Sequence, residues 1–231
     1  MKKKKTPKSG PYGGHIELIV DMERGHSKIA RVTSQFRFAF ELRNAARVMA
    51  NKARAVDDED SFELRAFVMA AVILAWSSLD AALNEFILLN ATEGESPLSD
   101  VEKAIINAIR SEKLRTRERQ HTLQLFNMML RLLKKSQLAE NEQPYQSANL
   151  VRHLRNMLVH PKPGWVVTFS ENPKENLSEQ QQIVKQLRSH LRLDRNATFP
   201  NDILNSKCAA WAVSSCESFL REFVKRSEVS P

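Results

Sequence analysis

Apolar residues recur every three or four positions along most of this chain, which is the spacing of helices that bury one face. Glycine is scarce, and four of the six glycines precede residue 26. Together these features predict an all-α fold, a helical bundle. The expected helices cover about Ser27–Ala55, Phe62–Thr92, Ser99–Arg110, residues 113–136, Gln146–Val159, Ser178–Leu193 and Ile203–Arg226.

The second of these helices, Phe62–Thr92, is the expected centre of the core. It is apolar on nearly all sides between Ala66 and Trp76, as in a helix covered by others. The acidic stretch 57–60 and Ser61 come directly before it, where they can satisfy the free amides of its first turn. The unbroken apolar run is 11 residues long, well below the roughly 20 that span a bilayer. We therefore expect no transmembrane helix and no membrane partner.

Two parts of the chain depart from the helical pattern. Residues 1–26 are expected to form a flexible basic tail that contains one short strand, Ile16–Val20. The helical domain then spans residues 27–227. Within it, residues 161–200 are expected to be a small insertion before the last helix, and Trp165–Phe169 is its strand candidate.

The composition fits one folded domain with a sizeable core. The chain has 231 residues, of which 42% are hydrophobic and 27% are charged. Its two cysteines, Cys208 and Cys216, are eight residues apart in one predicted helix. This separation is about 12 Å, too far for a disulfide, so we expect small core residues. The basic start lacks the apolar stretch of a secretory signal, and we expect a cytoplasmic protein.

The positive charge suggests an acidic partner such as RNA, but its distribution matters more than its size. The formal net charge is +8, and five lysines within the first eight residues leave +3 for the rest. The tail either adds affinity for phosphate or only keeps the protein in solution. The helix over residues 113–136 carries Arg115, Arg117 and Arg119, which either contact RNA or form a solvated face.

The segment Arg155-Asn156-Met157-Leu158-Val159-His160 carries the candidate chemistry. The chain has no phosphate-binding glycine loop, no His-Glu-x-x-His and no Cys-x-x-Cys, so we expect no metal and no cofactor. Arg and His can together cleave RNA without metal, because His moves protons and Arg stabilises the charge on the phosphate. Pro161 places His160 at or just past the end of its helix. The alternative is that Arg155 and His160 only cap that end.

This segment resembles the Arg-polar-x3-His signature of the HEPN superfamily, the helical domains of many prokaryotic toxins and RNA-degrading defence proteins. The segment Ser77–Phe86 resembles an early core helix of that family, and the order of the helices is similar. The resemblance implies a helical homodimer in which two motifs face one cleft and cleave RNA without metal. Arg155, Asn156 and His160 match the motif's arginine, adjacent polar residue and histidine.

The resemblance leaves several roles open. Asp80 and Glu85 lie on the helix that can pack behind the motif, where either can pair with Arg155 or His160, or remain an ordinary surface carboxylate. The alternative function is a non-catalytic helical module that binds RNA or a partner protein. A toxin or phage-defence role would also imply an antitoxin or another regulatory protein partner.

Overall fold

The computed structural model describes residues 15–23, 26–35, 38–58, 61–91, 99–100, 122–160, 179–194 and 197–227. Contacts within the chain divide it into two units, Met1–Phe38 and Ala39–Pro231. Among the described residues, the first unit contains a two-stranded sheet and the second contains helices. The all-α prediction is therefore confirmed for the unit that holds the core and the candidate motif.

The first unit contains an antiparallel pair of strands, β1 (His15–Glu23) and β2 (His26–Gln35), with an irregular register between Ile19 and Val20. The predicted strand Ile16–Val20 lies inside β1. The predicted start of the first helix at Ser27 is wrong, because residues 26–35 pair with β1 instead. The segment contains several β-branched residues, which favour a strand once a partner strand is available.

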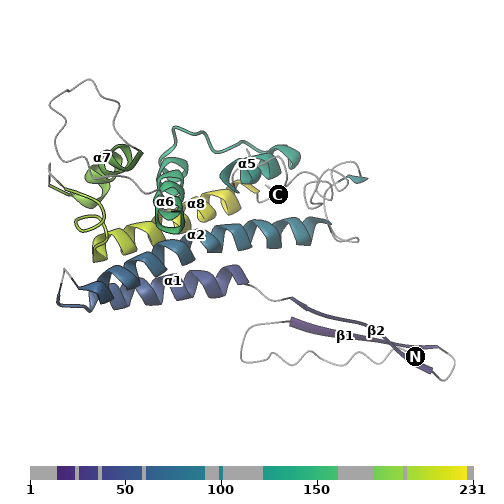
Figure 1. Cartoon of the computed structure of the whole chain (residues 1–231). Coiled ribbons are helices and arrows are strands. Elements are labelled where there is room, and N and C mark those ends of the chain that lie inside the picture. Colours follow the sequence, from purple (N-terminus) through teal and green to yellow (C-terminus); the bar gives the residue numbers. More distant parts are fainter. Residues whose placement is uncertain are drawn as a thin grey trace. The chain divides into compact units, whose positions relative to one another are not determined.

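The second unit is built from six described helices (Figure 1). Four lie close to their predicted ranges, and the α5 helix covers the last part of the predicted 113–136 helix. The C-terminal helix begins after a series of turns at residues 199–205. The bounds are α1 Phe38–Arg54, α2 Phe62–Ala91, α5 Thr122–Leu132, α6 Gln143–Val159, α7 Glu179–Leu191 and α8 Ser206–Ser227.

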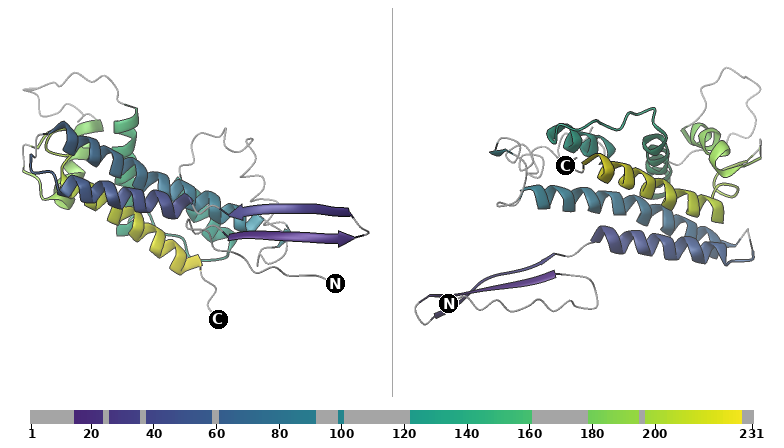
Figure 2. Two further views of the ribbon diagram at one scale, coloured as in Figure 1. Left: turned by 90° about the horizontal axis from the view of Figure 1, so that it is seen from below. Right: turned by 180° about the vertical axis from the view of Figure 1, so that it is seen from behind.

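The α2 and α8 helices lie side by side, and α6 crosses both of them (Figures 1 and 2). The α5 helix packs against α2 and α8. The α7 helix packs against α6 and α8. The α7 helix contributes Ile183, Val184, Leu187 and Leu191 to the same hydrophobic core. The described part of the predicted 161–200 insertion thus packs into the helical unit.

Aromatic rings from three helices meet in the core. Phe126 of α5 lies edge-on to Phe219 and Phe223 of α8, with ring centroids 5.3 and 4.6 Å apart, and Phe223 also meets Phe86 of α2. Such pairs add to the free energy of burial itself. The two cysteines are buried in the same helix α8, as predicted, and burial raises the pKa of the Cys208 thiol to about 12.

The α2 helix is the central element that the sequence predicted. Ser61 caps its start, because the Leu64 N–H donates to the Ser61 Oγ at 3.1 Å. By length and composition, Phe62–Ile87 is long and apolar enough to cross a membrane. The core helix of a soluble protein meets the same criterion, and here Val68 and Leu79 are completely buried among the other helices. The absence of a membrane span stays a prediction.

The predicted helix Ser99–Arg110 and the predicted strand Trp165–Phe169 lie almost entirely outside the described residues. The same holds for the lysine-rich start of the chain.

Candidate functional site

The candidate motif lies on α6, which is held at its start by an ion pair. Glu142, at the N-cap of α6, accepts from the Arg226 Nη2 of α8 at 2.6 Å, and the Arg226 Nε donates to Glu222 at 2.9 Å. The Arg226 guanidinium lowers the pKa of the Glu142 carboxyl. Further along α6, Val151 and Leu154 are completely buried. The helix that carries the motif is therefore fixed by both charge and packing.

The end of α6 places His160 as the sequence predicted. The helix ends at Val159, and His160 is its C-cap residue with φ −125° and ψ 64°. Its N–H donates to the Asn156 carbonyl at 2.8 Å, which closes the last turn. The His160 side chain is exposed. An imidazole at this position is accessible to a ligand in solution.

The structure brings Arg155 and Asn156 together. The Arg155 Nη1 donates to the Asn156 Oδ1 at 3.1 Å, so the amide orients one side of the guanidinium. The Arg155 Nε is shielded from solvent and has no acceptor within the described part of the chain. No hydrogen bond between the Arg155 and His160 side chains is recorded among these residues. An unsatisfied buried donor is uncommon in folded proteins and calls for a functional or structural reason.

Asp80 lies close enough to Arg155 of the motif to interact with it electrostatically. It is largely buried on α2 and accepts hydrogen bonds from Thr122 Oγ1, at the start of α5, and from Trp76. Burial raises the pKa of the Asp80 carboxyl, whereas the Thr122 hydrogen bond and the positive charge of Arg155 oppose this rise. The Asp80 carboxylate therefore links α2, α5 and Arg155 electrostatically.

Replacing Asp80 by Asn is expected to change how stability depends on pH. The pKa of Asp80 is raised in the folded state, so protonation of this carboxyl favours folding. This contribution to the free energy of unfolding is complete below the unfolded pKa and is lost as the pH rises through the folded pKa. Asp80→Asn should therefore gain stability relative to the parent as the pH rises. Urea unfolding of both proteins between about pH 4 and 7 measures this difference. A difference that is flat, or that falls with rising pH, would contradict the assigned environment.

Glu85 has a different role from that of Asp80. Its Oε1 accepts the N–H of Ala39 at 2.9 Å, so it satisfies a free amide in the first turn of α1. This contact gives Glu85 a structural function at the start of α1. The predicted RNA-binding residues Arg115, Arg117 and Arg119 lie outside the described residues.

One partly exposed side of α6 also carries residues that sequence reasoning missed. Asn149, Arg152, Asn156 and His160 follow one another at intervals of three, four and four, which places them on one face of a helix. We call these four residues the polar row. The Arg152 Nε donates to the Asn149 Oδ1 at 2.9 Å. The helical spacing was visible in the sequence, and it is the signal that would have identified Asn149 and Arg152.

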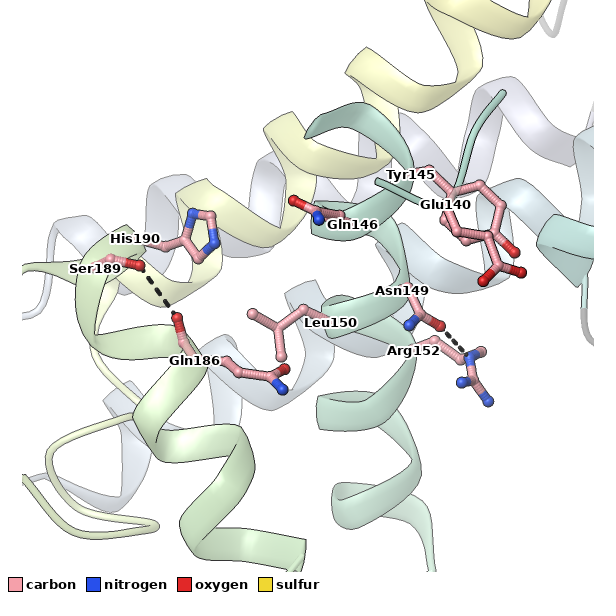
Figure 3. Close-up of a pocket in the computed structure, with 9 residues that line it drawn as sticks. All are labelled: Glu140, Tyr145, Gln146, Asn149, Leu150, Arg152, Gln186, Ser189 and His190. Atoms are coloured by element: carbon pink, nitrogen blue, oxygen red, sulfur yellow. Dashed lines mark hydrogen bonds between the residues drawn. The ribbon is translucent and has the colours of Figure 1, made fainter. Parts of the chain in front are cut away.

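A pocket of about 530 Å³ opens beside the first half of the polar row (Figure 3). It lies between α6 and α7, and Figure 3 shows Asn149 and Arg152 on α6 with Gln186 and His190 on α7. Its lining is mostly polar, with Leu150 as an apolar member. The full lining is Glu140, Tyr145, Gln146, Asn149, Leu150, Arg152, Gln186, Ser189 and His190.

Neither a metal centre nor a known relative supplies a function for this site. Among the described residues, no group of three or more His, Cys, Asp or Glu is placed to hold a metal ion. No family model, curated protein or solved structure matches the chain.

Proposed function

We propose that this protein is a metal-independent endoribonuclease of the HEPN type, acting as a cytoplasmic homodimer with a toxin or phage-defence role. In this proposal His160 transfers protons, Arg155 stabilises the charge on the phosphate and Asn156 positions Arg155. The RNA substrate supplies its own nucleophile, the 2′-hydroxyl. No metal and no cofactor take part.

The reaction balances with these groups alone. The 2′-hydroxyl gives up its proton as its oxygen forms a bond to phosphorus, the bond from phosphorus to the 5′-oxygen breaks, and the departing 5′-oxygen takes up a proton. The products are a 2′,3′-cyclic phosphate and a 5′-hydroxyl. An imidazole can serve both proton transfers, and a guanidinium can hydrogen-bond two phosphate oxygens while charge develops on them.

The proposal rests on how the side chains of the motif are arranged at the end of α6. Asn156 orients the Arg155 guanidinium at 3.1 Å, while His160 stays exposed at the C-cap of the same helix. If the motif served only to cap the helix, these side chains would donate hydrogen bonds to the last backbone carbonyls of α6. Instead, the His160 backbone N–H makes the closing bond, and its side chain is exposed to solvent.

The proposed homodimer is supported by the resemblance and by the exposed position of the motif. Val159 and His160 are both exposed at the end of α6, where a second copy can approach. Two motifs facing one cleft would supply two arginines and two histidines to one phosphate. Light scattering on the purified protein should then give twice the mass of the 26.4 kDa chain.

The test is incubation of the purified protein with labelled total RNA and tRNA in excess chelator. We expect cleavage that chelator does not reduce, with fragments that end in 2′,3′-cyclic phosphate. The same RNA with 2′-O-methyl groups should stay intact, because it lacks the nucleophile. Abolition of cleavage by chelator, or cleavage of the 2′-O-methyl RNA, would refute the proposed chemistry. Intact RNA in every reaction would favour the non-catalytic module that binds RNA or a regulatory protein.

A further inference from the structure

The pocket between α6 and α7 is placed to act together with the motif. Asn149 and Arg152 belong both to the pocket lining and to the polar row, and the row continues to Asn156 and His160. Four residues of helix rise by about 6 Å. A strand that ran along the row could therefore place one phosphate near Arg152 and the next near the motif, because successive phosphates in a nucleic acid are separated by a comparable distance.

Arg152 is a cation without a carboxylate partner among the ion pairs of the described residues. Its hydrogen bonds go to the Asn149 amide at 2.9 Å and to the His153 ring at 3.0 Å, and partial burial lowers its pKa. Its positive charge is therefore not paired with a carboxylate among the described residues and can attract an anionic ligand. Phosphate is one of the two anions, with carboxylate, that arginine recognises through paired hydrogen bonds.

The remainder of the pocket suits a nucleobase better than it suits a second phosphate. Gln146 and Gln186 present side-chain amides, which can donate to and accept from the edge of a base. Leu150 offers an apolar surface, and Glu140 can accept from an exocyclic amino group. The volume of about 530 Å³ is within the range of small-ligand sites, about 300–1,000 Å³.

We propose that this pocket binds one nucleotide of the RNA next to the cleaved phosphate, with Arg152 on its phosphate and Gln186 on its base. This inference rests on the proposed function for the identity of the substrate as RNA. It adds a positioning subsite that holds the strand along α6, separate from the residues that carry out the chemistry.

The test measures binding of RNA that cannot be cleaved, by fluorescence anisotropy with labelled 2′-O-methyl oligomers of adenosine, cytidine or uridine. Arg152→Gln should weaken binding about tenfold for all three, as expected for loss of a charge-assisted contact. It should also reduce the slope of log affinity against log salt by about 0.7, the share of one phosphate contact in a single strand. Gln186→Ala should reduce the differences among the three oligomers and leave the salt slope unchanged.

Two exposed residues provide matched controls. Arg131→Gln on α5 removes the same charge away from the pocket, and Gln182→Ala removes an amide one turn earlier on α7. Both should bind like the parent, and circular dichroism should show that all four variants are folded.

The outcomes separate this inference from the proposed function. The protein could bind the 2′-O-methyl oligomers in a way that the Arg152→Gln and Gln186→Ala variants weaken or alter, and yet leave ordinary RNA intact. This result would support the subsite and refute the nuclease. Cleavage of ordinary RNA by a protein whose Arg152→Gln variant keeps the parent's affinity and salt slope would overturn the subsite alone. Failure of the parent to bind any oligomer would also overturn the subsite.

Discussion

Replacing His160 by Ala is expected to reduce the rate of RNA cleavage by about 10²–10⁴-fold, the usual contribution of a positioned proton-transfer group. His160 is exposed and caps α6 through its backbone, since its N–H donates to the Asn156 carbonyl. Alanine keeps this hydrogen bond, so the helix should end at the same residue. Single-turnover cleavage of a defined labelled RNA in chelator measures the loss, and affinity for the 2′-O-methyl oligomer should change little.

The control for His160→Ala is Val159→Ala, at the neighbouring position. Val159 is also exposed, at 38% of its surface, but it offers no group that can move a proton. If both variants lost activity equally, the end of α6 would act as a surface for dimerisation or binding. If His160→Ala cleaved RNA as fast as the parent, His160 would have no part in the reaction.

The pattern of apolar residues predicted most of the helical unit because helix formation and burial follow the same spacing. The centre of α2 and the end of α6 were predicted within a few residues, since a long apolar stretch and Pro161 mark them clearly. The β2 strand was missed because Ile29 and Val32 also fit a helical spacing. Only pairing with β1, a contact between separate segments, makes that stretch a strand.

The site was predictable only in part. The sequence identified Arg155, Asn156 and His160 because adjacent residues of known chemistry form a short motif. It did not distinguish Asp80 from Glu85, which lie on the same helix. The structure separates them, because the partly buried Asp80 carboxylate interacts electrostatically with Arg155 while Glu85 accepts the amide of Ala39. The pocket could not be predicted, since it depends on how α7 packs against α6.

Replacing Phe126 by Ala is expected to lower the free energy of unfolding by about 3–5 kcal/mol, the range for removing a fully buried aromatic ring. Phe126 has no exposed surface, and its ring meets Phe219 and Phe223 of α8. The loss is a large share of the roughly 5–15 kcal/mol that stabilises a typical domain. In a unit of this size it should lower the melting temperature by about 6–20 °C, as measured by circular dichroism or calorimetry.

The matched control is Phe62→Ala, because Phe62 is 75% exposed at the start of α2 and should change stability by no more than about 0.5 kcal/mol. An equal loss in both variants would contradict the assigned core.

The effect on the site should follow from the same geometry, since Phe126 holds α5 against α8 and the first residue of α5, Thr122, donates to Asp80. A cavity at Phe126 should therefore weaken the hydrogen bond from Thr122 that holds the Asp80 side chain near Arg155. Below its melting temperature, Phe126→Ala should cleave RNA more slowly than Phe62→Ala.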